Sequence, residues 1–129
     1  MAKGHRSQIK KERNENNKER RAHAIAKYVR VSDTKARIVL DQIKGKDIGT
    51  ARALLEYSPR YAASVIKKVL NSAVANAENN LGLNIEALFV EEVVANQGPT
   101  FKRVQPISRG RAHRILKRTS HISIYLNER

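Results

Sequence analysis

The densest chemical feature of the sequence is the run PTFKRVQPISRGRAHRILKR, residues 99–118. It holds seven basic residues and no acidic one: Lys102, Arg103, Arg109, Arg111, Arg114, Lys117 and Arg118. Like charges crowded in this way repel one another unless a polyanion outside the chain neutralises them. A solvated charge run usually includes acids, and Phe101 and Ile107 are poor solvent-facing residues unless they pack on something. The run therefore indicates binding of nucleic acid or another polyanion.

Catalysis would have to be built from four histidines or from one acidic pair. The histidines are His5, His23, His113 and His121, and no local spacing brings two of them to one phosphate. Glu91 and Glu92 are adjacent on an expected strand, so they are predicted to point to opposite faces and to pair with a nearby Lys or Arg. The sequence has no cysteine, Gly-rich phosphate loop, nucleophile elbow or metal-ligand spacing. We expect no enzyme, metal, cofactor or small-molecule substrate.

The distribution of charge separates a neutral domain from two basic appendages. The 129-residue chain has a formal charge of +14. Residues 1–21 carry eight basic and three acidic residues, and residues 22–98 carry ten and eight. We expect residues 1–21 to form a disordered basic tail, with a mixed-charge helix as the alternative, and residues 22–129 to form one domain.

A membrane role is not indicated. No apolar run is long enough to span a bilayer, and no signal-peptide hydrophobic stretch follows the basic start. The best helix has only Arg60, Lys67 and Lys68, too few for a basic membrane-binding face. We expect a cytosolic, cytoplasmic protein.

Hydrophobic periodicity predicts a strand, three helices and then two strands. Residues 24–31 form the first strand, with Ile25, Val29 and Val31 on one side. Ser32 caps the first helix, which ends near Gly45, and Asp47 caps the second. Their stripes are Ala36, Val39, Leu40 and Ile43, then Ile48, Ala51, Leu54 and Leu55.

The third helix has the longest stripe. Ser58 is its predicted cap, Pro59 occupies its first position, and it ends near Gly82. Its apolar residues are Ala62, Val65, Ile66, Val69, Leu70, Ala73, Val74 and Ala77. Residues 88–95 and 121–126 are the later strands, the second burying Ile122, Ile124 and Leu126. The predicted class is α+β, with helices on one face of a small sheet.

The basic run joins the last two strands, where about two to five residues would suffice. Two arms of nine residues would instead reach roughly 30 Å at ~3.3 Å per residue. Gly110 suits a tip turn, and Pro106 removes one ladder donor. A lone two-stranded ribbon is marginal in water, so it needs an external surface, and its charge indicates phosphate. Such a ribbon suits folded RNA, although β-ribbons also enter the DNA major groove.

Four stretches resemble the universal large-subunit ribosomal protein L-twenty-two family, bacterial type. They are VSDTKARIVLDQIKGK (31–46), IKKVLNSAVANAENN (66–80), GPTFKR (98–103) and GRAHRILKRTSHI (110–122). The last is the most specific, because its four basic residues and His121 all fall at the family's spacing. Together the stretches span most of residues 22–128 in the family's order.

The resemblance implies three helices packed on a three-stranded antiparallel sheet, with a long protruding β-hairpin at residues 98–118. In the family this hairpin threads through large-subunit rRNA of the 23S type, and its tip lines the polypeptide exit tunnel. Such a protein is a structural constituent of the subunit that supports assembly and translation, with neighbouring ribosomal proteins and the nascent polypeptide as partners. The seven cations of the run are implied to bind rRNA. The implied tunnel tip comprises Pro106, Ile107, Ser108, Arg109, Gly110, Arg111 and Ala112.

Two departures and one alternative stay open. The family often has another Arg just after the tip proline, where this chain has Ile107 and Ser108. The tail before Ala22 is longer than in many bacterial members, so no family role transfers to it. The alternative function is a DNA-compacting architectural protein that uses the same basic ribbon.

Overall fold

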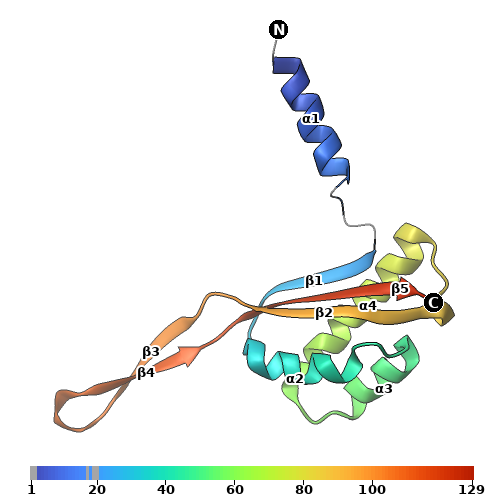
Figure 1. The fold of residues 1–129 in the computed structure, drawn as a ribbon. Coiled ribbons are helices and arrows are strands. Elements are labelled where there is room, and N and C mark those ends of the chain that lie inside the picture. The colour runs from blue at the N-terminus through green and yellow to red at the C-terminus, as the bar shows by residue number, and fades with distance from the viewer. Residues whose placement is uncertain (1–2, 17, 19–20) are drawn as a thin grey trace.

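A small antiparallel sheet covered on one face by three helices forms the body of the protein, and a long hairpin projects from it (Figure 1). The computed structural model describes residues 3–16, 18 and 21–129. The helices are α1 (Lys3–Asn16), α2 (Asp33–Ile43), α3 (Ile48–Tyr57), α4 (Tyr61–Leu81) and the short 3-10 turns η1 (Ile85–Ala87) and η2 (Ser108–Gly110). The strands are β1 (Ala22–Val29), β2 (Leu88–Gln97), β3 (Phe101–Pro106), β4 (Ala112–Lys117) and β5 (Ser120–Glu128). The three-stranded sheet has the order β1-β5-β2, with both pairings antiparallel, and the predicted α+β class is confirmed.

The core lies between the sheet and the stripes of α2, α3 and α4. The predicted α4 stripe is buried except for Val65, which is partly buried against the core. From the sheet, the predicted Ile122, Ile124 and Leu126 of β5 are fully buried. Alanines in the stripe let α4 approach β1 closely, and Asn76 Nδ2 donates to the carbonyl of His23 at 2.9 Å. The core is therefore complete within the domain.

The inward face of β1 differs from the prediction. Ala22 and Ala24 are buried, whereas Ile25 is 49% exposed on the uncovered face of the sheet. An irregularity between Ala26 and Val29, where Tyr28 has a φ of 57°, then shifts the alternation by one residue. Val31 is consequently buried as predicted, although Ile25 is not. A one-residue bulge reverses the facing of every residue on one side of it.

The helix boundaries follow the predictions with two corrections. Ser32 and Asp47 are the N-cap residues of α2 and α3, although neither side chain makes a capping hydrogen bond. Gly45 and Gly82 have the positive φ that ends a helix. The α4 helix begins at Tyr61 with Arg60 as N-cap, so Ser58 and Pro59 belong to the connection before it. In α3, Leu54 is exposed, and Ile48, Ala51 and Leu55 form the buried stripe.

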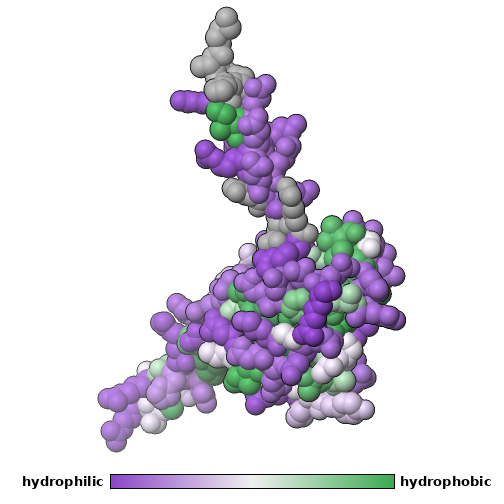
Figure 2. Space-filling model, turned by 45° about the vertical axis from the view of Figure 1, so that its right-hand side comes forward, coloured by the Kyte–Doolittle hydropathy of each residue, from purple (hydrophilic) through white to green (hydrophobic). Residues whose placement is uncertain are grey.

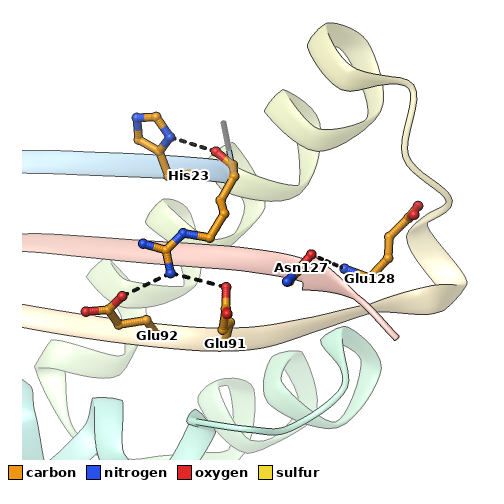
Figure 3. A network of polar contacts seen from close by, with 6 residues as sticks. His23, Glu91, Glu92, Asn127 and Glu128 are labelled. Carbon is orange, nitrogen blue, oxygen red and sulfur yellow. Dashed lines mark hydrogen bonds and ion pairs between the residues drawn. The ribbon is translucent and has the colours of Figure 1, made fainter. Parts of the chain in front are cut away.

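The acidic pair on β2 also corrects a prediction (Figure 3). Glu91 and Glu92 both reach Nη1 of Arg21, at 3.2 Å and 3.1 Å, instead of pointing to opposite faces. A register shift between Val90 and Glu92 turns the two carboxylates toward the same guanidinium. The expected role as an ion-pair partner for a basic residue is confirmed. Two carboxylates held by one arginine are occupied by structure, and no mechanism is built on them.

The N-terminal segment contains a helix where a disordered tail was predicted. Helix α1 stands apart from the domain in Figure 1, and all side chains at positions 6–16 are exposed. Its mixed charges and single large apolar residue, Ile9, leave it no face to bury, which matches the helical alternative. The predictions for residues 1–2, 17, 19 and 20 lie outside the described residues. Across the described ranges, no helix is long and apolar enough to cross a bilayer.

Candidate nucleic-acid interface

The basic run forms a two-stranded ribbon that extends from the ends of β2 and β5 (Figure 1). Strands β3 and β4 pair from Phe101–Lys117 at the base to Pro106–Ala112 at the tip. Every residue from 101 to 118 is exposed, so the ribbon has no core of its own. An isolated ribbon of this kind is marginally stable in water. Its seven cations are therefore fully available to a partner.

The pairing register alternates charge with apolar side chains on both faces of the ribbon. Residues directly opposite each other on antiparallel strands point to the same face. The four cations of the paired region each lie opposite an apolar residue, in the pairs Lys102–Leu116, Arg103–Ile115, Arg114–Val104 and Lys117–Phe101. This arrangement avoids direct like-charge opposition, which destabilises a ladder. Both faces thus offer cations for phosphate and apolar surface for packing.

The hairpin cations differ from those of the domain in their partners. In the domain, Arg37 pairs with Asp33, Lys67 with Glu56 and Arg129 with Asp47. Within the described residues, none of the seven hairpin cations pairs with an acidic group. Figure 2 shows the hairpin as a mainly hydrophilic projection with scattered hydrophobic patches. The neutralising charge for this surface must come from outside the chain.

The tip is a tight turn with two consecutive residues in the left-handed region. Arg109 has φ 59° and ψ 37°, and Gly110 has φ 68°. The turn closes through Ile107 N–H, which donates to the carbonyl of Arg111 at 2.8 Å. The predicted positive φ at Gly110 is confirmed. The predicted tip residues 106–112 all belong to this turn or to the closing pair Pro106–Ala112.

Replacing Gly110 with Val is expected to strain the turn without disturbing the domain. A Cβ at this position meets no atom within 4 Å, so the cost comes from the φ of 68° alone, on the order of 1–3 kcal/mol. NMR should show lost cross-strand contacts between Pro106 and Ala112 with an unchanged melting temperature. The matched control, Gly110→Asn, tolerates the left-handed region and should keep those contacts. A lowered melting temperature for Gly110→Val would contradict this local effect.

At its base the hairpin is fastened to the domain by short contacts. Gly98 N–H donates to the carbonyl of Thr119 at 2.9 Å, and Thr119 Oγ1 donates to the carbonyl of Pro99 at 2.5 Å. Thr119 is buried, although the residues before it are exposed. The guanidinium of Arg30 lies 4.7 Å over the ring of Phe101. The base of the ribbon is therefore positioned by the domain.

Gly98→Ala is expected to lower the free energy of unfolding by about 1–3 kcal/mol, because it overpacks this base. The added Cβ would lie 2.6 Å from Thr119 Oγ1 and 3.3 Å from Cε1 of His121. Thr119 is β-branched and buried, so it cannot swing away. Urea unfolding measures the loss. In a Thr119→Ala background, where the closest atom is absent, Gly98→Ala should cost much less, and an equal cost in both backgrounds would exclude the clash.

The histidines do not converge on a common site. His23 stacks on Tyr125, and His121 Nδ1 accepts from Tyr28 N–H at 3.0 Å. His113 lies on the exposed ribbon, and His5 lies on α1. Among the described residues, no three metal-ligating side chains are grouped closely enough to hold an ion.

The structure places three further cations beside the hairpin base that the sequence analysis did not select. Arg30, Lys35 and Arg60 line one cavity with Lys117 and Arg118 of the ribbon. They come from three separate elements of a nearly neutral segment, so no run of charge marks them in the sequence. Their grouping depends on the packing of α2 and α4.

Comparison with known proteins identifies the family. The profile of the family described as ribosomal protein L22p/L17e matches residues 24–127. The large ribosomal subunit protein uL22 of Lachnoclostridium phytofermentans is 57% identical over 129 residues, which cover all of both chains. Its namesake in Lachnospira eligens is also 57% identical over the full length of both. The protein of the same name in Clostridium tetani is 59% identical over 108 residues, 84% of this chain and 97% of the relative.

These matches confirm the resemblance carried by the basic hairpin and the helical stripes. The profile covers the domain and the whole ribbon, including all seven cations of the basic run. Family membership rests on most of the chain and not on one motif. This chain belongs to the ribosomal protein L22p/L17e family.

Proposed function

We propose that this protein is a non-enzymatic constituent of the large ribosomal subunit in the cytoplasm, and that its hairpin binds large-subunit rRNA. The observation that carries the proposal is the ribbon of residues 101–118, fully exposed and without acidic partners among the described residues. Polyanion binding explains why such a ribbon is retained on a stable domain. The names of the relatives, large ribosomal subunit proteins, support the choice of partner.

The two parts of the hairpin are assigned different roles. Arm cations such as Arg103, Arg114 and Lys117 bind phosphates, since RNA must pack along the arms to support a ribbon without a core. The tip at residues 106–112 lines the polypeptide exit tunnel and faces the nascent polypeptide. Ile107 and Ser108 give this tip an apolar and a small polar side chain after Pro106, where many relatives present a cation. Neighbouring ribosomal proteins complete the set of partners.

Sedimentation of tagged protein from cell extract tests the assignment. The protein is expected in the large-subunit fraction at moderate salt and is expected to leave it only at high salt, because many released counterions make binding steeply salt-dependent. Recovery mainly in ribosome-free fractions at moderate salt would refute the proposal. Tighter binding to duplex DNA than to large-subunit rRNA at matched salt would favour the architectural alternative.

A further inference from the structure

A cavity of about 710 Å³ lies where the base of the hairpin meets the domain; we call it the junction cavity. Its walls come from the connection between β1 and α2, the first turns of α2 and α4, and the end of β4. The volume is within the range of about 300–1,000 Å³ typical of sites for small ligands. The junction cavity is distinct from the tip and from most of the arms.

The lining of the junction cavity is strongly cationic. Its charged members are Arg30, Lys35, Arg60, Lys117 and Arg118, and no acidic residue lines it. The nearest acid in sequence, Asp33, is bound by Arg37 at 3.0 Å, and its side chain is only 13% exposed. In the described part of the chain, none of the five cations has an acidic partner. An anionic group entering the cavity therefore meets uncompensated positive charge from several elements.

The junction cavity also contains an available aromatic surface. Tyr61, the first residue of α4, lines the cavity and is 70% exposed. Its ring makes no ring contact or side-chain hydrogen bond with any other described residue. Phe101, by contrast, is already covered by Arg30. A flat apolar ligand with attached negative charge is the chemistry that this combination fits.

We propose that the junction cavity receives one unpaired nucleotide of the bound RNA, with its base stacked on Tyr61 and its phosphates among Arg60, Lys35 and Lys117. Paired bases are inaccessible to a side chain within an RNA helix, whereas splayed bases stack on aromatic rings. The inference rests on the proposed rRNA binding and adds a second, separate contact. The ribbon and the cavity share Lys117, so RNA packed along the arm passes the cavity entrance.

Substitutions at Tyr61 test the stacking. The probe is a large-subunit rRNA transcript, bound to the full-length chain in a filter assay over a series of salt concentrations. Tyr61→Ala should weaken binding roughly 5- to 100-fold at every salt concentration while leaving the salt slope unchanged. Tyr61→Phe keeps the ring and should bind as the parent does. Equal weakening by Ala and Phe would overturn the stacking.

The matched control is Tyr57→Ala. Tyr57 is also a surface tyrosine, 88% exposed at the end of α3, and it does not line the junction cavity. Its replacement should leave the affinity unchanged. Arg60→Ala and Lys35→Ala should each lower the salt slope by about one. Base-specific chemical probing should reveal one unpaired nucleotide protected by the parent and reactive with Tyr61→Ala.

Failure of this inference is distinguishable from failure of the proposed function. Normal binding by Tyr61→Ala, together with weak binding by a variant lacking the arm cations, would remove the junction cavity and leave the ribbon in place. Normal binding by the variant lacking the arm cations would instead contradict the proposed function itself.

Discussion

Joint replacement of Arg103, Arg114 and Lys117 by alanine is expected to lower the salt slope of rRNA binding by about three. Each unit of slope corresponds to about a tenfold change in affinity per tenfold change in salt, so three lost contacts cost on the order of 10³-fold at 0.1 M relative to 1 M salt. All three side chains are exposed and lack acidic partners among the described residues. Their loss therefore removes RNA contacts without removing any described ion pair. Filter binding to a large-subunit rRNA transcript over a salt series measures the effect.

The control removes the same net charge from the domain. Arg52, Lys67 and Arg129 bond to Asn71, Glu56 and Asp47 respectively, away from the ribbon. Their joint replacement by alanine should leave most of the affinity and the slope in place. An equal loss from both triple variants would show that total charge, rather than the ribbon, determines binding. Gly110→Val at the tip should also leave rRNA affinity nearly unchanged, because it removes no cation.

The helical part of the fold could be predicted from the sequence because its signals are local. The α4 stripe repeats at three and four residues for five turns, and a helix with such a stripe has one way to bury it. Positive φ at Gly45, Gly82 and Gly110 was likewise readable, because these glycines follow periodic segments or interrupt a ribbon. The start of α4 was misplaced because Ser58 and Pro59 are favourable at a helix start and also in the turn before one.

The errors in the sheet have a shared cause. Ile25 was assigned inward by alternation, and Glu91 and Glu92 were assigned to opposite faces by the same rule. Each prediction failed where the strand contains an irregularity, between Ala26 and Val29 in β1 and between Val90 and Glu92 in β2. Such irregularities depend on the partner strand and the helix behind it, so a single strand's sequence does not reveal them. α4 packing close to β1 favours alanine on the inner face and leaves Ile25 outside.

The candidate interface was predictable where its residues are contiguous. A run of seven cations without acids marks the ribbon directly, and its length indicates a hairpin. Arg30, Lys35 and Arg60 carry no such mark, because each lies among residues of mixed charge. They become one surface only when α2 and α4 begin beside the hairpin base. Charge runs reveal extended binding elements, whereas concave sites assembled from several elements require the tertiary structure.

Amide exchange of the free protein is expected to divide the chain into a stable domain and a labile ribbon. Amides in the interior of α4, at residues 65–74, lie on a helix whose stripe is buried against β1 and β5. They should exchange only through global unfolding, with protection factors on the order of 10³ or more. Amides of β3 and β4 lie in a two-stranded ladder in which every residue is exposed. Opening that ladder exposes little additional apolar surface, so protection there should be slight.

Adding the rRNA transcript should change the ribbon and leave the interior of α4 as it was. Arm amides such as that of Arg103 are expected to gain protection, because RNA packed along the ribbon supplies the surface that the ribbon lacks by itself. The triple arm variant serves as the control, since its ribbon should stay labile at the same RNA concentration. Strong protection at residues 109–114 without RNA would mean that the ribbon is stable alone. Absence of protection at residues 65–74 would mean that the domain itself folds only on RNA, despite the apolar core that its helices and sheet enclose.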